Sequence, residues 1–568
     1  MTAFTMLKEK IMKHIFTVLL VLIGVLVILP MTACNDTTTS ASTTAASVTT
    51  APVTTAPCEH SYTDVVTEPT VEAQGFTTHT CQKCGHSYVD TYTDPLKVID
   101  LQYDDYVTEL ESITSTDKLT IEGDDCLEVI GKNGKKYFHA KGIGTATVTA
   151  GDSKVVVTVG KARLHIMLVM GQSNAGNHFA NAMSDVKCEL GTAYYWSHDG
   201  VISDFISTTK GWHAPFLAEF RAQSEAAGKP EKLVLVWHEG ETTRSGKPIT
   251  EWATSATNTA GTDGTVKMLK ECLAYYTSPV RADKYEIVAK GMYWLQGEAG
   301  GEPVEYTTLF MAIYNRLKEN GIEYCGIFRV RQGSSANKNT DDHNDLSHTG
   351  TLRAQLELVN SRDDMYLITD ITENWYGVST AKHSIDISKY ITMMKYYGQK
   401  ASYTDSLGNR ATFKDGILTT YMPELFGKNN YCHYGKFGYG IIGADAAYNM
   451  YHALYGNEMG IVYADTSGTV HHQIRAKAGE THTIDLKTVT GMLTFRPDCY
   501  STAGTLSVKI MSGDTDITNV DGMFSKAELT YGAIAKDVLA SYENVTITVT
   551  YTAKGGASQS AVFTVVNG

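Results

Sequence analysis

The chain has 568 residues, 43% of them hydrophobic, and this length is too great for a single hydrophobic core. We therefore expect about two to four folded domains. The formal net charge of -14 argues against nucleic acid or an anionic membrane face as the main partner, because phosphate groups bind to basic surfaces. A neutral ligand suits such a chain better.

The chain begins with the features of a secretory signal. Lysines precede the apolar run 15–29, which is too short to span a membrane comfortably. Small residues before Cys34 resemble a bacterial lipobox, which implies cleavage before Cys34 and a lipid on its sulfur. Ordinary signal cleavage nearby, with Cys34 incidental, is the alternative. The lipobox interpretation predicts an extracytoplasmic protein that touches the bacterial membrane only through this lipid anchor.

Residues 34–57 consist almost wholly of Thr, Ser, Ala, Val and Pro. Such a segment cannot bury enough apolar surface to offset the entropy that it loses on ordering. We expect a flexible linker that holds the folded part of the chain away from the membrane.

Cysteines and histidines gather directly after this linker. A tetrahedral zinc site could form from four of them, namely Cys58, His60, Cys81 and Cys84. His86 is a substitute ligand. A disulfide within the group is the alternative for an exported protein. The pattern resembles small zinc-ribbon-like modules of bacterial surface proteins, and this structural zinc is the one cofactor that the sequence suggests.

Two stretches alternate apolar and polar residues with glycines between them, which is typical of β-sandwiches. In the first, the sequence GIGTATVTA at 142–150 resembles a bacterial immunoglobulin-like domain, for which we expect a spacer role. In the second, the strand 545–551 has apolar residues on one face and threonines on the other. We expect all-β domains on both sides of the central region.

The central region alternates expected strands with expected helices. The strands are 164–170, 232–237, 287–295, 325–330 and 365–371. The helices are 216–227, 265–276, 307–320, 351–360 and 436–454. This alternation predicts right-handed crossovers and a parallel sheet with helices on both faces, so the functional site should lie at the carboxyl ends of the strands.

These patterns divide the chain into a signal peptide, a linker, a Cys/His module, an immunoglobulin-like sandwich, an α/β domain and a C-terminal β-sandwich. The expected boundaries are 1–33, 34–57, 58–95, 96–160, 161–458 and 459–568.

The first central strand runs directly into the sequence GQSN. Gly171 and Gly176 allow a tight turn that would lift the Ser173 hydroxyl toward a ligand. A serine that merely caps the following helix is the alternative. Similar polar segments follow later strands, at 237–243, 294–298 and 430–433. Together they can supply the nucleophile, base, orienting group and oxyanion donors of an acyl-transfer enzyme.

The GQSN block and the W-x-QGE block at 294–298 resemble the SGNH-hydrolase superfamily, and more narrowly its sialate O-acetylesterase and acetylxylan esterase group, carbohydrate esterase family six. The resemblance covers around half of the chain and implies a flavodoxin-like α/β/α three-layer sandwich. It also implies that Ser173 is the nucleophile and His433 the base. The oxyanion hole would combine the backbone N–H groups of Ser173 and Gly240 with the Gln296 amide.

The sequence departs from the family at Asn430, where members often have an aspartate three residues before the histidine. An asparagine can accept a hydrogen bond from the imidazole but cannot stabilise imidazolium as a carboxylate does. We expect Glu298 to take that role. The alternative roles are that Glu298 caps or braces the sheet, that Gly240 is a turn glycine, and that Gln296 is a hydrogen bonder at the strand end.

A second histidine competes with His433 for the role of base. The sequence Asp-Leu-Ser-His at 345–348 matches Asp-x-x-His literally, so His348 could be the base with Asp345 behind it. We favour His433, because the superfamily places its base before the last helix, whereas an expected helix and strand follow His348.

The leading hypothesis is therefore a surface-tethered serine carboxylic ester hydrolase, a carbohydrate O-acetylesterase for acetylated glycans of the sialate or xylan type. It needs no cofactor for catalysis. All tryptophans lie in the central region, where one or two could stack on a sugar ring. The alternative, suggested by Asn430, is a non-catalytic glycan binder or adhesin on a degenerate esterase fold. A phospholipid lipase is a weaker hypothesis, because the sequence has no amphipathic or basic segment that would dock on a bilayer.

Overall fold

The structure is a computed structural model. It describes residues 58–176, 186–197, 200, 202–204, 211–299, 303–331, 348–372, 375, 382–404, 408, 410–421, 425–427, 430–455, 460–466, 470–489, 492–496, 504–523, 533–553 and 558–567. The expected signal, the lipidation site Cys34 and the linker lie outside this part of the chain, and so does Asp345. No helix within it has the length and apolar character needed to cross a membrane. The described residues form two compact units, one of residues 58–65 with Thr78–Asp90, and one of Val66–Thr77 with the described residues from Thr91 onward.

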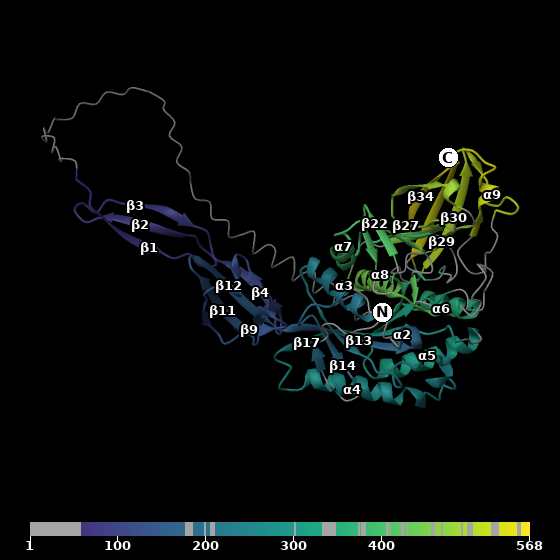
Figure 1. Ribbon diagram of the computed structural model, residues 1–568, viewed down its shortest axis with the longest axis horizontal. Helices are drawn as coiled ribbons and strands as arrows, with labels where there is room; N and C mark the ends of the chain where they lie inside the picture. Colours follow the sequence, from purple (N-terminus) through teal and green to yellow (C-terminus); the bar gives the residue numbers. More distant parts are fainter. Residues whose placement is uncertain are drawn as a thin grey trace, which may run out of the picture. The chain divides into compact units, whose positions relative to one another are not determined.

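The expected Cys/His module contains a three-stranded sheet in the order β1-β2-β3 (Figure 1). Its strands are β1 (Tyr62–Thr67), β2 (Gly75–Cys81) and β3 (Ser87–Thr93). Most of their side chains are exposed, and Cys81 is a rare buried one at 1% exposure. A sheet that buries so little apolar surface needs another source of stability.

The next segment is an all-β sandwich, as expected. One sheet has the order β4-β12-β11-β8 and the other β5-β10-β9. Phe138 of one sheet and Val148 and Val157 of the other are fully buried in one shared core. The strands are β4 (Lys97–Gln102), β5 (Tyr106–Val107), β6 (Glu109–Leu110), β7 (Ile113–Thr114), β8 (Thr120–Gly123), β9 (Leu127–Lys132), β10 (Lys135–Ala140), β11 (Gly144–Ala150) and β12 (Ser153–Gly160).

The central sheet has the order β15-β14-β16-β13-β17-β18-β19. Neighbouring strands run parallel except at the edge, where β15 pairs with β14 in antiparallel fashion. All the expected strands are present, and β14 and β15 are additional. The strands are β13 (Ala162–Gly171), β14 (Ala193–Trp196), β15 (Ile202–Asp204), β16 (Lys232–Val236), β17 (Tyr285–Leu295), β18 (Tyr324–Phe328) and β19 (Met365–Thr369).

Helices cover both faces of this sheet, which confirms the expected layering. Met167 and Val169 of β13 pack with α3 and α8, whereas Ile166 and Leu168 pack with α4, α5 and α6. Figure 1 shows α3 and α8 on one side and α4 and α5 on the other. The helices are α2 (Ser173–Gly176), α3 (His213–Ala226), η1 (Ile249–Glu251), η2 (Ala260–Thr262), α4 (Asp263–Thr277), α5 (Pro303–Glu319), α6 (Thr349–Ser361), α7 (Ile391–Tyr397) and α8 (Lys436–Tyr455).

From Lys382 to the C-terminus the chain is rich in strands, with the helices α7, α8 and α9 between them. One sheet has the order β21-β22-β23-β20-β27-β26-β29-β32 and another β28-β34-β33-β30-β31, with β24 and β25 as a separate pair. Because β20 pairs with β27, strands from both sides of the boundary expected at residue 458 share one sheet. The strands and short helices are β20 (Lys382–Asp386), β21 (Ser402–Thr404), β22 (Arg410–Lys414), β23 (Ile417–Tyr421), β24 (Phe426–Gly427), β25 (Asn430–Tyr434), β26 (Gly460–Thr466), β27 (Val470–Lys477), β28 (Thr481–Asp485), η4 (Leu486–Thr488), β29 (Met492–Arg496), β30 (Gly504–Ser512), β31 (Thr515–Asp516), β32 (Ala533–Ala535), α9 (Lys536–Leu539), β33 (Val545–Ala553) and β34 (Ser558–Val566).

The first β-sandwich is bonded to the central sheet through buried charges. The Lys232 side chain, which is 0% exposed, places Nζ 2.8 Å from the Asp105 carboxylate. The Tyr194 hydroxyl donates to Asp104 at 2.7 Å. A buried lysine is stable only beside its partner, so the segment expected to be a spacer is fixed to the α/β region by a specific contact.

Candidate active site

The turn after β13 depends on Gly171, whose φ is +137°. A Cβ at this position would collide with the Leu295 carbonyl at the end of β17, so only glycine lets the two strand ends approach. The backbone then enters α2 at Ser173. Ser173 thus lies at the carboxyl end of a strand in the middle of a parallel sheet, and its side chain is partly exposed.

Glu298 joins the GQSN block to the QGE block. The side-chain amides of Gln172 and Asn174 each donate to Glu298 Oε2 at 2.7 Å. Arg331 Nε donates to Glu298 Oε1 at 3.3 Å. The Glu298 side chain is 10% exposed and that of Arg331 is 5% exposed, so water screens these charges weakly. Both carboxylate oxygens therefore bind the ends of neighbouring strands to one another.

These contacts bear on the role expected for Glu298. The Glu298 carboxylate accepts hydrogen bonds from two amides and a guanidinium, and so fixes the shape of the GQSN turn. These contacts fit the alternative in which Glu298 braces the sheet. Orientation of the imidazole by Glu298 stays a prediction. Asn430, the residue at the family's aspartate position, begins β25.

His433 lies in β25, directly before α8. The element α2, which begins at Ser173, is in contact with β25. The Tyr439 hydroxyl, from α8, donates to Asn174 Oδ1 at 2.8 Å. The strand and helix that carry His433 are therefore attached to the serine turn. Both ring nitrogens of His433 are shielded from solvent.

The competing histidine, His348, precedes α6 and is 5% exposed. Its Nδ1 donates to the Arg331 carbonyl at 3.0 Å, because a carbonyl oxygen can only accept. Its own carbonyl accepts from the Leu352 N–H at 3.0 Å. Both bonds hold His348 at the start of the helix, near the arginine that binds Glu298.

The two further oxyanion candidates are engaged elsewhere. Gly240 has a φ of +98°, and its N–H donates to the Thr243 carbonyl at 2.8 Å, which fits the turn-glycine interpretation. Gln296 is 0% exposed, and its Nε2 lies 3.4 Å from the Lys247 carbonyl that accepts from it. Its Oε1 is buried and has no hydrogen-bond partner among the described residues. The oxyanion roles of Gly240 and Gln296 stay predictions.

Sequence reasoning did not find Arg331 or Tyr439. Besides binding Glu298, the Arg331 guanidinium lies 5.4 Å from the centre of the Tyr434 ring, next to His433. Burial raises the pKa of the Tyr439 hydroxyl above its usual range, so this side chain acts as a neutral hydrogen-bond donor. Arg331 follows the fourth expected strand, and that position was a signal that could have identified it.

Most tryptophans are core residues. Trp212, Trp252, Trp294 and Trp375 are each at most 1% exposed. Trp237 is only partly buried, and its ring N–H donates to Thr243 Oγ1 at 2.9 Å. A Cβ on Gly176 of α2 would meet the same Thr243 oxygen at 2.7 Å, so the loop 237–243 packs against α2. Trp237 belongs to this loop.

A second buried polar cluster lies near the amino end of the same sheet. His165 of β13 is 0% exposed, and its Nδ1 donates to Glu231 at 3.4 Å. On the other side, His165 Nε2 lies 2.9 Å from the Tyr293 hydroxyl, and the Tyr324 hydroxyl is also within hydrogen-bond distance. Arg163 pairs with Glu231 at 3.4 Å. His165 and Glu231 are buried, with side chains 0% and 3% exposed, whereas Arg163 is partly exposed at 34%.

The Cys/His cluster forms a compact group that can hold a metal ion. One ligand atom from each of Cys58, His60, Cys81 and Cys84 lies within 4.8 Å of all the others. The three cysteines are free thiols. Burial opposes ionisation of Cys81, but hydrogen bonds from His60 and the backbone outweigh it and lower the pKa of this thiol to about 5. His86, the substitute ligand, lies outside the group, with its Nδ1 3.1 Å from the Tyr62 hydroxyl.

No protein-family model and no curated protein matches the chain. Among solved structures, an Arabidopsis thaliana protein is similar at a TM-score of 0.30 and 12% identity, over 50% of this chain and 97% of that one. A 2,6-sialyltransferase from a Photobacterium species, solved with CMP and lactose, is similar at a TM-score of 0.16 and 9% identity, over 47% of this chain and 48% of that one. TM-scores this low establish neither a shared fold nor a shared function.

Proposed function

We propose that the chain is a surface-tethered serine esterase that removes acetyl groups from sugar hydroxyls. Its central region would be an SGNH-type domain, flanked by immunoglobulin-like sandwiches and anchored through a lipid on Cys34. The observation that carries the proposal is the placement of Ser173, partly exposed after a central parallel strand, with the strand of His433 in contact with its helix.

In the proposed reaction, His433 takes the proton of the Ser173 hydroxyl as the oxygen attacks the acetyl carbonyl. The Ser173 N–H and the Gln296 Nε2 hydrogen that does not bind the Lys247 carbonyl stabilise the oxyanion that forms. The sugar hydroxyl leaves with the proton from His433, and water then releases acetate from the acyl-enzyme. Trp237 offers an aromatic face for the sugar ring beside this turn.

Glu298 supports the reaction by holding the GQSN turn, because its oxygens are engaged by Gln172, Asn174 and Arg331. If Glu298 does not orient the imidazole, the residue at the family's aspartate position is Asn430, which can accept a hydrogen bond but carries no charge. Asn430→Asp should raise kcat if this assignment is right, and should leave kcat unchanged if Glu298 orients His433.

The decisive experiment replaces the nucleophile in the full chain. Ser173→Ala should lower hydrolysis of 4-nitrophenyl acetate and of an acetylated glycan by at least about a thousandfold. Ser361→Ala, an exposed serine at the end of α6, is the matched control and should retain full activity. Full activity of Ser173→Ala would overturn the proposal. Absence of fluorophosphonate labelling, with glycan binding intact, would favour the non-catalytic binder instead.

We also propose that Cys58, His60, Cys81 and Cys84 hold a structural Zn²⁺. A tetrahedral site with Zn–S near 2.3 Å and Zn–N near 2.05 Å has S–S edges of about 3.8 Å and S–N edges of about 3.6 Å. The Cys58 and Cys81 sulfurs are 3.9 Å apart, and Cys84 Sγ is 3.4 Å from His60 Nδ1. A disulfide needs sulfurs about 2.05 Å apart. The separations therefore favour the metal.

Metal analysis of the purified full chain tests this site. We expect about one zinc per chain, lost in Cys84→Ser, and retained in His86→Ala because His86 lies outside the four-residue group. Esterase activity should survive loss of the metal. A chain that binds no zinc and has only one reactive thiol among these three cysteines would show the disulfide instead.

A further inference from the structure

The serine turn has little stability of its own. The helix that begins at Ser173, α2, has only four residues, and a single helical turn does not persist without outside contacts. Its position, and with it the position of the Ser173 hydroxyl, therefore depends on the groups that bind it. These groups come from two directions, namely from the strand ends of the sheet and from the helices α3 and α8.

On the strand side, Gln172 holds the turn. Its backbone N–H donates to the Leu295 carbonyl at 3.0 Å, and its side-chain Oε1 accepts from the Gly297 N–H at 3.3 Å. Its Nε2 donates to Glu298 at 2.7 Å. These bonds fix the residue before the nucleophile to β17 and the loop that follows it, rather than to the strand and helix that carry the proposed base.

On the helix side, the contacts converge on Asn174, the residue after the nucleophile. Its carbonyl accepts from the Trp212 indole N–H at 3.0 Å, and the next carbonyl, that of Ala175, accepts from His213 Nε2 at 2.8 Å. Both donors belong to the start of α3. The Tyr439 hydroxyl of α8 donates to Asn174 Oδ1 at 2.8 Å. Two helices therefore hold this side of the turn.

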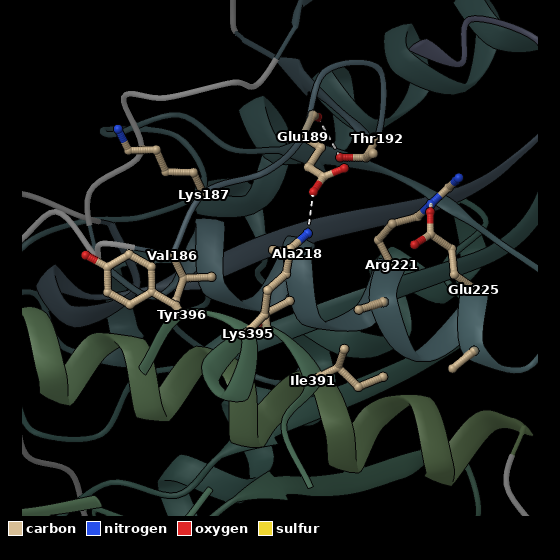
Figure 2. A pocket seen from close by; sticks show the side chains of 13 residues that line it. Val186, Lys187, Glu189, Thr192, Ala218, Arg221, Glu225, Ile391, Lys395 and Tyr396 are labelled. Carbon is tan, nitrogen blue, oxygen red and sulfur yellow. Dashed lines mark hydrogen bonds and ion pairs between the residues drawn. The ribbon is translucent and has the colours of Figure 1, made fainter. Parts of the chain in front are cut away.

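The two helices are themselves packed closely together at this point. A Cβ at Gly443 of α8 would come within 2.4 Å of the Trp212 carbonyl, so glycine is needed for the helices to approach this closely. Later turns of α3 line a cavity of about 640 Å³ that contains none of the candidate catalytic residues (Figure 2). The start of α3 and the helix α8 thus form one support for the serine turn, separate from that cavity.

The direction of the bonds at Asn174 follows from side-chain chemistry. Asn174 Nδ2 lies 2.7 Å from Glu298 Oε2. A carboxylate can only accept, so Asn174 presents its NH₂ group to Glu298 and its Oδ1 to Tyr439. Tyr439 must then donate. Burial, together with the nearby charge of Glu298, raises the pKa of Tyr439 and keeps its hydroxyl protonated for this role.

Tyr439 also connects the serine turn to the proposed base. It lies near the start of α8, directly after the strand of His433, and its ring meets the Tyr434 ring edge-on with the ring centres 5.6 Å apart. Its backbone N–H donates to the Gly435 carbonyl at 2.9 Å. A shift of the segment that carries His433 is therefore passed to Asn174 through the Tyr439 hydroxyl.

We propose that Tyr439 is a positioning residue of the esterase. Acting through Asn174, its hydroxyl holds Ser173 at the separation from His433 that proton transfer needs. This inference rests on the proposed function. Tyr439 touches neither the substrate nor the reacting atoms, so its loss should slow the chemical step and leave substrate binding unchanged.

Steady-state kinetics of Tyr439→Phe in the full chain test this role. The variant keeps the ring and loses the hydroxyl, so we expect kcat for 4-nitrophenyl acetate to fall about 10- to 100-fold while KM changes less than about threefold. Tyr390→Phe is the matched control, because the buried Tyr390 hydroxyl donates to Asp445 of the same helix at 2.6 Å. It should lower the melting temperature at least as much as Tyr439→Phe, since its acceptor is a carboxylate, and should leave kcat unchanged. An equal fall in kcat in both variants, or an unchanged kcat in Tyr439→Phe, would overturn the proposal.

A double-mutant cycle shows whether Tyr439 acts through Asn174. Asn174→Ala removes the acceptor of the same bond, so adding Tyr439→Phe to it should lower kcat by no more than about a further twofold. Effects that multiply independently would overturn the proposal. Asn174→Ala alone should lower kcat at least as far as Tyr439→Phe, and wild-type kcat in Asn174→Ala would also overturn the proposal, even if Tyr439→Phe does not fold.

These outcomes separate the positioning role from the proposed function. A wild-type chain that does not hydrolyse 4-nitrophenyl acetate or an acetylated glycan overturns both. An active wild type that loses its activity in Ser173→Ala, but keeps it in Tyr439→Phe, overturns the positioning role alone.

Discussion

The two ends of the central sheet each hold a buried polar cluster, and the clusters differ in access rather than in residue type. At the amino end, His165 lies between a carboxylate and tyrosine hydroxyls. A carboxylate, an imidazole and a hydroxyl are also the three groups of a catalytic triad. Yet His165 is 0% exposed, and its hydroxyl partners are buried tyrosines whose pKa values are raised by burial. At the carboxyl end, Ser173 is partly exposed.

This difference teaches that residue types alone do not define a reactive site. At the amino end, both ring nitrogens of His165 have hydrogen-bond partners inside the core, so the contribution of His165 is to stability. The carboxyl-end cluster has the same kind of buried brace, Glu298, but the brace supports a turn that reaches solvent. Equivalent substitutions at the two ends can therefore distinguish effects on stability from effects on catalysis.

The largest expected effect separates the two histidines at the carboxyl end. His433→Ala should lower kcat for 4-nitrophenyl acetate by about a hundred- to ten-thousandfold, because it removes the proposed general base. His348→Ala should change kcat less than about tenfold, since the His348 ring is held by the Arg331 carbonyl. Steady-state kinetics of both variants check this, and the opposite ranking would make His348 the base.

A matched pair of glutamate variants is expected to have the next largest effect. Glu298→Gln should lower the free energy of unfolding by about 1–3 kcal/mol and kcat by about 10- to 100-fold, because it loosens the GQSN turn. Glu231→Gln should cost about the same stability, through its buried bonds to His165 and Arg163, but leave kcat unchanged. Denaturant unfolding and kinetics on both variants check the pair. A fall in kcat for Glu231→Gln would mean that the amino-end cluster is coupled to the reaction.

The smallest expected effect is a pH dependence confined to the amino end. Burial by itself raises the pKa of Glu231, but the hydrogen bond and charge of His165 and the charge of Arg163 outweigh it, so the pKa lies below its ordinary value of 4.5. A group with a lowered folded pKa stabilises the fold above its unfolded pKa, and this contribution is lost as pH falls through the folded pKa. The melting temperatures of wild type and Glu231→Gln should therefore converge below about pH 4.5. A constant difference between pH 7 and pH 3 would contradict this.

Much of the central fold could be predicted because its signals are local. The run 164–170 is apolar on both strand faces, and the structure buries Met167 and Leu168 on opposite sides of the sheet. By contrast, the strands β14 and β15 were not predicted, because they are short. The strand β20 pairs with β27, which is far from it in the chain. No local pattern specifies such a partner.

The sequence by itself determined where a nucleophile could stand, because only glycine allows the backbone turn that Gly171 makes at the end of a buried strand. It also indicated that Cys58, His60, Cys81 and Cys84 come together, while leaving His86 as a substitute ligand. Only the tertiary structure decided what each polar side chain binds. Glu298 meets Asn174 across 124 positions and Arg331 across 33, and such partners follow from which strand ends the fold brings side by side.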